Sequence, residues 1–370
     1  MTLRHLIPLF ALLFAFQPAL SADTTLDASD PHLMNDAKRK TVNARAAEME
    51  ALGKQHDADS EKTLLETLAN KELHHRIRSA ASGALRDRKS EAAIPVYLAV
   101  LQDTSDNQYV RYSAALNLAW MKAVDAIPAL RTALQDQEAF VRTGAASALG
   151  LLGEASAEAA PDLAKQVESD TNAKARREAA SALSRIGVHT EAVAASLLKG
   201  LKDEDDWVRI YAAGALATMK EHGTAGIAEM IDQLGKPNSG NSLKEYYLKA
   251  LGDFGELAAK QAAPVAAGAL KDKEDDIRSS AVYALGKFGA EAKPYSADII
   301  KLLSDSSDLV RMSAALAVGY LKLEEAIPTL KEMGTNPKGR NDRMSAISAL
   351  GSIGTPEAKK LAEEFAEKGF

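Results

Sequence analysis

The stretch Val141-Arg142-Thr143-Gly144-Ala145-Ala146-Ser147-Ala148-Leu149-Gly150 decides the fold, because variants of it return about every 33 residues along the chain. Relative to its arginine, the apolar residues fall at positions −1, +3, +4 and +7, which share one face of an α-helix. A repeat of this length predicts stacked helical units, each of which buries its apolar face only against its neighbours. The basic residues at the arginine position are Arg78, Arg111, Arg142, Arg176, Arg209, Lys244, Arg278, Arg311 and Arg343.

Each unit is expected to hold a second amphipathic helix before the one that carries the arginine. We name the arginine-bearing helix "helix B" and the one before it "helix A". Proline is tolerated in the first turn of a helix, where its missing N–H would have no intrahelical partner, so recurring prolines predict the starts of helix A. These prolines are Pro95, Pro128, Pro161, Pro264, Pro294 and Pro328.

An acidic turn is predicted between helix A and helix B. Its aspartate lies six to eight residues before the arginine, where it can accept from the free N–H groups of helix B and pair with the arginine. We therefore expect a ladder of Asp and Arg side chains that links adjacent turns. The turn aspartates are Asp103, Asp136, Asp170, Asp203, Asp272 and Asp305, and the ladder also includes Arg111, Arg142, Arg209, Arg278 and Arg311.

The ladder has two interpretations. The arginines either form an anion-binding row, or each guanidinium is already occupied by a carboxylate and serves folding. The recurrence of both residue types at constant register favours the structural interpretation. In the fifth unit the turn at residues 235–242 lacks the aspartate and Lys244 replaces the arginine, and this joint loss supports the pairing. That turn is either a contact site or hinge, or a tolerated insertion in a surface loop.

These elements together resemble the HEAT-repeat family, and most closely its short bacterial form, which also occurs in phycobilisome lyase-like proteins. The likeness rests on the proline of helix A, the turn aspartate, the Val-Arg start of helix B and the Ala-Ala…Leu-Gly that follows, over roughly residues 60 to 354. The resemblance implies an all-α, right-handed solenoid of antiparallel helix pairs with B helices on its concave side. It implies no particular ligand.

The first 22 residues have the pattern of a secretory signal peptide. Arg4 provides the positive region, residues 6–16 are apolar, and small residues end the segment, with cleavage expected after Ser21 or Ala22. The alternative, a retained membrane anchor, is disfavoured because the apolar run is short for a bilayer. We expect a polar linker at residues 23–31 and a solenoid at residues 32–370, with a capping helix at each end.

Composition narrows the classes of partner. The 370-residue chain has a formal net charge of −6, and loss of Arg4 makes it one unit more negative. A mildly acidic protein without a basic stripe is a poor candidate for nucleic-acid binding. The chain has no cysteine, which excludes disulfides, thiolate chemistry and a lipidated cysteine. We expect a periplasmic or secreted protein without stable membrane insertion after signal cleavage.

No motif predicts catalysis, a cofactor or a metal site. None of the seven histidines is followed by a glutamate in a His-Glu pair, and no HExxH, phosphate-binding loop or Gly-x-Ser-x-Gly elbow occurs. Ser196 and Lys199 match a Ser-x-x-Lys pattern but lack its partner motifs. The acidic runs at 203–206 and 272–276 lack the glycine and final glutamate of an EF-hand, and are interpreted as helix caps, although a role for calcium stays open.

The outward side of helix B carries the candidate binding residues. Its positions −2, +1, +2 and +5 hold aromatic residues or methionine where polar residues are the usual choice, although only 5% of the chain is aromatic. Tyrosine and tryptophan dominate binding hot spots, so we expect this surface to bind a protein segment. The alternative is that the larger side chains cover the gaps between repeats. The candidates are Tyr109, Tyr112, Trp207, Tyr211, Tyr246, Tyr283 and Met312.

These patterns predict a non-enzymatic scaffold that binds a protein partner on its concave face. The alternatives are a lyase-type enzyme of the phycobilisome lyase class and a ligand-sensing accessory module of an envelope system. The expected export argues against the lyase, whose substrates are cytoplasmic.

Overall fold

The computed structural model describes residues 36–236 and 239–367, and the expected signal peptide and linker lie outside this range. The chain divides into two compact units, residues 1–84 and 85–370, which are described separately. The described part of unit 1 contains α1 (Asp36–Leu52), α2 (Ala58–Ala69) and most of α3 (His75–Asp87). In α3, Arg78 is buried and its Nε donates to the carbonyl of Leu68, 2.8 Å away.

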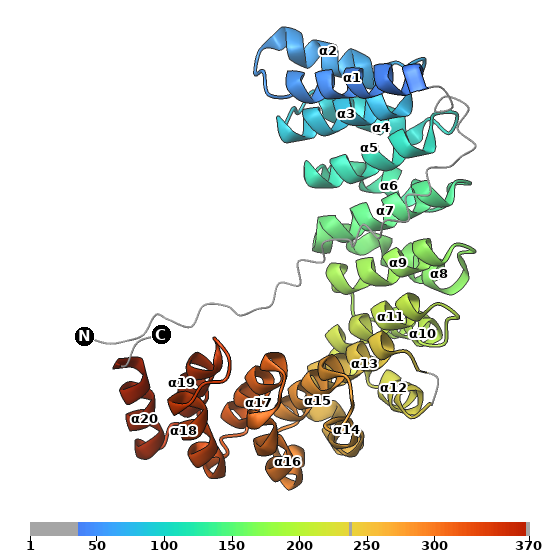
Figure 1. Cartoon of the computed structure of the whole chain (residues 1–370). Coiled ribbons are helices and arrows are strands. Elements are labelled where there is room, and N and C mark those ends of the chain that lie inside the picture. Colours follow the sequence, from blue (N-terminus) through green and yellow to red (C-terminus); the bar gives the residue numbers. More distant parts are fainter. Residues whose placement is uncertain (1–35, 237–238, 368–370) are drawn as a thin grey trace. The chain divides into compact units, whose positions relative to one another are not determined.

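Unit 2 alternates the two kinds of predicted helix, and its described residues contain no strand (Figure 1). The A helices are α4 (Ala93–Gln102), α6 (Ile127–Ala133), α8 (Ala160–Ser169), α10 (Glu191–Gly200), α12 (Gly226–Leu234), α14 (Glu256–Ala269), α16 (Ser296–Lys301), α18 (Ile327–Thr335) and α20 (Pro356–Glu367). The B helices are α5 (Gln108–Trp120), α7 (Ala139–Leu152), α9 (Ala173–Ile186), α11 (Asp206–Thr218), α13 (Asn241–Phe254), α15 (Asp275–Lys287), α17 (Asp308–Tyr320) and α19 (Asp342–Ile353). Short 3₁₀ segments are η1 (Val124–Ala126), η2 (Gly153–Ala159), η3 (Lys220–Gly223), η4 (Gly289–Tyr295), η5 (Leu302–Ser304) and η6 (Glu324–Ala326).

The B helices of unit 2 pack one against the next from α5 to α19. The alanines at +3 and +4 lie in these contacts: Ala145 and Ala146, for example, have no exposed surface. A Cβ atom placed on Gly150 would lie 2.9 Å from the Cα of Ala182 on the next B helix, and one on Gly252 would lie 2.9 Å from the Cα of Ala284. The small residues of the repeat therefore set how closely neighbouring B helices approach. The result is an all-α solenoid.

The prolines mark the starts of most A helices, with two exceptions. Pro128, Pro161 and Pro328 lie at the first or second helical position, as predicted. Pro264 instead lies inside α14, which begins at Glu256, and Pro294 lies inside η4, before α16. The prediction that these two prolines start helix A was wrong, because the polypeptide is already helical upstream of each.

A residue with positive φ follows each B helix of unit 2, eleven positions after the arginine or its lysine replacement, and another follows α3 at the same register. A positive φ ends a helix and is adopted most readily by glycine. Glycine takes the position five times, and lysine takes it four times with φ between 51° and 56°. The glycines are Gly153, Gly187, Gly255, Gly289 and Gly354, and the lysines are Lys89, Lys122, Lys220 and Lys322.

Candidate functional site

The Asp and Arg ladder joins successive repeats of unit 2 rather than two residues of the same repeat. Arg142 donates from Nε and Nη2 to the two oxygens of Asp170, at 2.7 and 2.6 Å, and its Nη1 donates to the carbonyl of Asp136 at 2.9 Å. The arginine thus holds the backbone of its own turn and the carboxylate of the next turn. The other pairs between units are Arg111 with Asp136, Arg176 with Asp203, Arg278 with Asp305 and Arg311 with Asp342.

The predicted pairing of each arginine with the carboxylate of its own turn was therefore wrong. Within one repeat the guanidinium contacts the carbonyl of the turn aspartate and not its carboxylate, as Arg209 does with Asp203 at 2.7 Å. The predicted helix cap also differs. The Asp203 carboxylate accepts from the N–H of Asp205, and Asp205 in turn accepts from the N–H groups of Trp207 and Val208. The turn aspartate therefore orders the turn, and the next polar residue caps the helix.

Hydrogen bonds from the ladder arginines favour the ionised forms of Asp170 and Asp305. Burial acts to raise the pKa of Asp170, but hydrogen bonds from Arg142 and from the N–H of Asn172 outweigh it, so the pKa lies below its ordinary value. The same opposition, with Arg278 as donor, lowers the pKa of Asp305. These arginines are engaged and do not form an anion-binding row.

The ladder is interrupted at the fifth unit. The Nη2 of Arg209 pairs with Asp206 on its own helix, while its Nε is buried without a partner in the described part of the chain. On the other side of the interruption, neither Lys244 nor the carboxylate of Asp272 forms an ion pair with any described residue, although Asp272 accepts from the N–H of Glu274. The prediction that Arg209 and Asp272 belong to the ladder was wrong with respect to their side-chain partners.

The candidate residues on α5 pack against the neighbouring helix. The rings of Tyr109 and Tyr112 lie 5.1 and 4.3 Å from that of Phe140 on α7. A Cβ atom on Gly144 would lie 2.6 Å from the Tyr112 ring, so this glycine makes room for the tyrosine. Burial, followed by the charge of Glu178, raises the pKa of Tyr112. Tyr112 therefore covers the gap between two repeats.

A second aromatic group joins α11 and α13. The centre of the Trp207 ring lies 6.2 Å from that of Tyr211 and 6.0 Å from that of Tyr246. The ammonium of Lys249 lies 5.1 Å from the centre of the Tyr246 ring. The two tyrosines are half-buried, whereas Trp207 is 37% exposed. Burial raises the pKa of Tyr211, with Glu178 as the next cause. Of these three, Trp207 offers the most area to a partner.

The most continuous exposed apolar surface on a B helix lies on α17 and includes residues that sequence reasoning missed. Leu309, Met312, Leu316 and Tyr320 follow one another at intervals of three or four residues, and each is exposed. We name this set the α17 stripe. Tyr320 is 57% exposed. Met312 was the only member predicted, because the prediction rested on aromatic residues and methionine at positions −2, +1, +2 and +5, and therefore included neither leucine nor position +9.

The surroundings of the α17 stripe combine apolar and cationic groups. Met344 on the adjacent α19 is 54% exposed. The ammonium of Lys287 lies 4.9 Å from the ring of Tyr320 and 5.7 Å from that of Tyr283. The hydroxyl of Tyr283 donates to the carboxylate of Asp253, and burial followed by this contact raises its pKa. Tyr283 is thus fixed on α15, and the stripe lies beside it.

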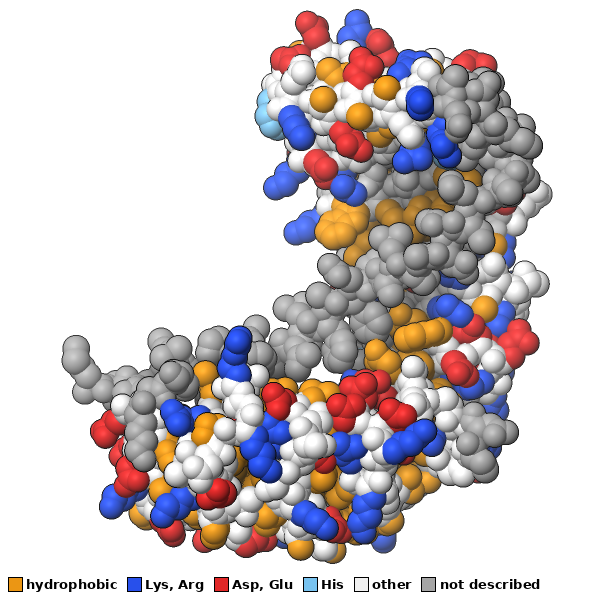
Figure 2. Space-filling view, viewed as in Figure 1, with side chains coloured by type: hydrophobic (Ala, Val, Ile, Leu, Met, Phe, Trp, Pro, Cys, Tyr) orange, Lys and Arg blue, Asp and Glu red, His pale blue; other side chains and the backbone are white. Residues whose placement is uncertain are grey.

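The residue at position +9 is also apolar and exposed on the first two B helices of unit 2. Trp120 on α5 is 62% exposed and Leu151 on α7 is 42% exposed. Figure 2 shows apolar side chains in groups among basic and acidic ones on the visible face. The structure thus brings apolar residues to the B-helix surface, although several predicted ones serve packing.

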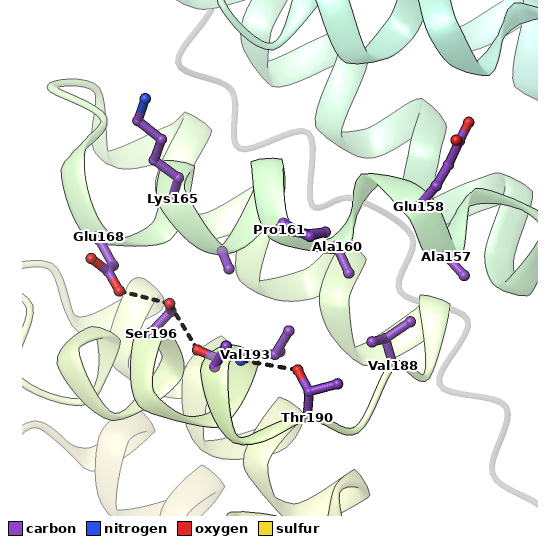
Figure 3. A pocket seen from close by; sticks show the side chains of 12 residues that line it. Ala157, Glu158, Ala160, Pro161, Lys165, Glu168, Val188, Thr190, Val193 and Ser196 are labelled. Carbon is purple, nitrogen blue, oxygen red and sulfur yellow. Dashed lines mark hydrogen bonds between the residues drawn. The ribbon is translucent and has the colours of Figure 1, made fainter.

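Ser196, the first residue of the Ser-x-x-Lys pattern, lines a groove between α8 and α10 together with Glu168 (Figure 3). The hydroxyl of Ser196 donates to one oxygen of Glu168 at 2.7 Å, and the ammonium of Lys199 donates to the other at 2.7 Å. Hydrogen bonds from Lys199 and then Ser196 lower the pKa of Glu168. A carboxylate held ionised in this way is a poor base for activating the serine. These contacts link the A helices α8 and α10 through polar side chains.

Within residues 36–236 and 239–367, no three His, Cys, Asp or Glu side chains lie together as a metal-ligand set. Across the same ranges, every helix is too short or too polar to span a bilayer.

Comparison with solved structures finds several helical solenoids. Importin beta matches with a TM-score of 0.53 and 16% identity over 86% of this chain and 48% of that chain. Kap95p, from a structure of its complex with RanGDP, matches with a TM-score of 0.54 and 16% identity over 84% of this chain and 50% of that chain. The chain therefore spans about half the length of these two proteins. The complex of CpcE and CpcF of phycocyanin lyase from Nostoc sp. PCC7120 matches with a TM-score of 0.45 and 21% identity, over 65% of this chain and 94% of that chain.

Sequence comparison gives the family. No curated protein sequence matches the chain. The model of HEAT repeats matches residues 94–184, 160–241 and 296–369, which together make up more than half of the sequence. With the repeated helix pairs and the recurring Asp and Arg pairs between repeats, this match shows that the chain belongs to the HEAT-repeat family.

Proposed function

We propose that this HEAT-repeat solenoid is a non-enzymatic scaffold of the periplasm or the extracellular space that captures a protein partner on its B-helix surface. The observation that carries the proposal is the α17 stripe. A row of four exposed apolar side chains along one helix, next to the exposed Met344, is the kind of surface that partners cover.

The arrangement of the stripe favours a helical or extended polypeptide as partner. Leu309 and Tyr320 are eleven residues apart, which corresponds to about 16 Å along a helix. Amphipathic segments bind such rows through apolar residues at matching intervals. The same architecture binds a protein in the Kap95p complex with RanGDP, so the fold is compatible with this role.

A scaffold role is also supported by the polar groups of the molecule. These groups are engaged in contacts within the protein: the ladder arginines hold turns together, and Ser196 and Lys199 both contact Glu168. Export is supported by the signal-peptide pattern of residues 1–22. Cell fractionation, with N-terminal sequencing of the mature protein, tests the location. A mature chain that begins at residue 22 or 23 is expected, and retention of Met1 in the cytoplasm would contradict it.

Site-specific photocrosslinking in the native host tests the binding surface. A photoreactive amino acid replaces Leu316 on α17 in one variant and Leu257 on α14 in another. The two leucines are 44% and 39% exposed, so the pair is matched in residue type and exposure but lies on different layers of the solenoid. We expect a discrete crosslinked protein from position 316 and none from position 257. Equal crosslinking at both positions, or none at 316, would contradict the proposal.

A charge substitution measures the contribution of the stripe. Leu316→Asp is expected to weaken binding of the crosslinked partner about 30-fold, because truncating or charging a hot spot costs about 2 kcal/mol or more. Leu257→Asp is the control and should leave the affinity unchanged. Both variants should keep the thermal stability of the native protein within a few degrees, since both side chains are exposed.

The aromatic candidates differ in what their removal should do. Trp207→Ala is expected to weaken binding with little loss of stability if the partner extends to α11. Tyr112→Ala should lower the stability instead, because this ring packs over Gly144. A stability loss for Trp207→Ala as large as that for Tyr112→Ala would remove Trp207 from the proposed surface.

A further inference from the structure

The helix beside the α17 stripe carries opposite charges at its two ends. On α15, Asp276 lies at position −2 and Lys287 at position +9, which are the positions of Leu309 and Tyr320 on α17. Eleven residues make about three turns of a helix, so the two charges share one face of α15. Both side chains are exposed, and neither forms an ion pair within the ranges that the structure describes.

Lys287 is held in place at the C-terminal end of the stripe. Its ammonium lies 4.9 Å from the centre of the Tyr320 ring on α17 and 5.7 Å from that of Tyr283 on its own helix. These ring contacts restrict the lysine but give its ammonium no carboxylate. Nearby, the carboxylate of Asp253 accepts from the hydroxyl of Tyr283, and the ammonium of Lys220 donates to the carbonyl of Asp253. Two ammonium groups and one carboxylate leave this end positive.

The opposite end of the same surface is acidic on the α15 side. Asp275 and Asp276 in the first turn of α15, and Asp308 in the first turn of α17, are all exposed. Asp308 pairs with Arg311, and the loop that contains the exposed Arg340 lies against Asp308. The carboxylate charge open to a partner therefore comes mainly from α15.

This arrangement of charges distinguishes the two directions in which a helix could lie on the stripe. Because of its dipole, a helix favours acidic side chains in its first turn and basic ones in its last turn. A partner helix of this ordinary kind meets opposite charges at both ends of α15 only if it runs antiparallel to α15. In the parallel direction, like charges meet at both ends, which disfavours the complex.

We infer that α15 and α17 bind an amphipathic helix that runs antiparallel to α17 and carries acidic residues in its first turn, beside Lys287. Its apolar side chains cover the α17 stripe, and a basic residue of its last turn meets Asp276. The inference rests on the function proposed above, and it adds the secondary structure, the charge pattern and the direction of the bound segment.

Binding of synthetic peptides to the full-length protein tests the charge pattern. The probe is a peptide stapled as a helix, with leucines spaced to match the stripe, glutamates in its first turn and lysines in its last turn. A second peptide has glutamines in place of the glutamates. We expect Lys287→Glu to weaken binding of the glutamate peptide about tenfold and of the glutamine peptide far less, as measured by fluorescence anisotropy. Lys260→Glu, at an exposed lysine of α14, is the matched control and should leave both affinities unchanged.

Paramagnetic NMR of the bound glutamate peptide measures the direction. The chain has no cysteine, so Ser352→Cys and Asn341→Cys each introduce a single site for a nitroxide label. These exposed residues lie at positions +9 and −2 of the next repeat, the positions of Tyr320 and Leu309 on α17. A nitroxide at residue 352 should broaden the signals of the first turn of the peptide more than those of its last turn, and one at residue 341 should do the reverse. The opposite pattern, or equal broadening of both ends, would overturn the inference.

Photocrosslinking at Leu316 tests capture of the natural partner and does not depend on the peptides. If position 316 captures a partner but Lys287→Glu leaves the affinity of the glutamate peptide unchanged, the scaffold function stands and the inference fails. Failure of the glutamate peptide to bind the native protein, or binding that survives Leu316→Asp, would also overturn the inference, because the peptide would then not occupy the stripe.

Discussion

Lysine at the ends of four B helices is the least expected choice of residue in the molecule. Lys89, Lys122, Lys220 and Lys322 adopt the positive φ that five other repeats give to glycine. An L-residue with a side chain pays about 1 kcal/mol for this conformation relative to glycine. A cation near the C-terminal carbonyls of a helix recovers part of that cost. The ammonium of Lys220 donates to the carbonyl of Asp253, in the last turn of the next B helix, α13.

Glycine at two of these positions is expected to stabilise the protein. Lys122→Gly and Lys322→Gly should each raise the free energy of unfolding by about 0.5 kcal/mol. Glycine relieves the backbone strain of the positive φ, and this gain exceeds the loss of the favourable interaction between the lysine charge and the C-terminus of the helix. Urea unfolding followed by circular dichroism measures the change. Gly187→Ala is the reverse control, since a Cβ atom there meets nothing within 4 Å and only the backbone conformation is tested. A loss of stability in both lysine variants would mean that the ammonium groups outweigh the strain.

Sequence reasoning at this scale reached the residues but not all of their partners. The recurrence of aspartate with arginine predicted that the two interact, and they do. The spacing suggested the wrong partner, because it measures distance along one unit, whereas Arg142 meets Asp170 through the stacking of two units. The spacing of residues along one repeat does not specify how the next repeat is displaced when the two stack. For the same reason Tyr109 and Tyr112 were expected on an open face, although the neighbouring helix places Phe140 against them.

At the scale of elements, each Asp and Arg pair ties one B helix to the turn before the next. Removing one partner leaves a buried charge, so Asp170→Asn should lower the free energy of unfolding at neutral pH by about 3 kcal/mol. The side chains of Arg142 and Asp170 are 14% and 4% exposed, which places this pair among the buried ones. The interruption at the fifth unit is the natural place to add such a pair.

Lys244→Arg is expected to complete the ladder toward Asp272. The two positions are 28 residues apart, the same separation as Arg142 and Asp170, and Asp272 has no basic partner among the described residues. A gain of about 1 kcal/mol in the free energy of unfolding is expected from a charge-assisted hydrogen bond. Asp272→Asn in the same background should cancel the gain. If the double variant keeps the gain, the arginine acts through some contact other than Asp272.

The ladder also predicts the behaviour in acid. The pKa values of Asp170 and Asp305 are lowered in the folded protein, so their ionised forms contribute stability above the ordinary aspartate pKa of about 3.9, and this contribution is lost as the pH falls through the folded pKa. Urea unfolding between pH 7 and pH 3 should show a steep loss below about pH 4. The loss should be shallower in Asp170→Asn, which has no such group to protonate. Glu154→Gln, at an exposed position on η2, should leave the profile unchanged.

At the scale of the whole molecule, the repeated plan was predictable because each unit repeats the same local signals. Helix starts, alanines and turn aspartates recur in register, and their repetition identified an all-α solenoid. The binding surface was less predictable, because exposure depends on what the neighbouring helix covers. Position +9 illustrates this: it is apolar and exposed at Trp120 and Tyr320, but charged at Arg185 and Lys287.

Because the ladder is interrupted at the fifth repeat, we expect a destabilising substitution on one side of the interruption to affect mainly the helices on that side. In a stack where each unit contacts only its neighbours, destabilisation spreads through the interfaces between units. Ion pairs run from Arg111 to Asp203 and again from Arg278 to Asp342, but none of them links α11 to α13 or α13 to α15 in the described residues. Asp170→Asn should therefore speed amide hydrogen exchange in α7 and α9 by about 100-fold, since about 3 kcal/mol is lost there, and change α17 and α19 far less. Asp305→Asn should give the opposite pattern. Equal acceleration across all B helices in both variants would show instead that unit 2 opens as one cooperative block, with the fifth unit coupled as tightly as the rest.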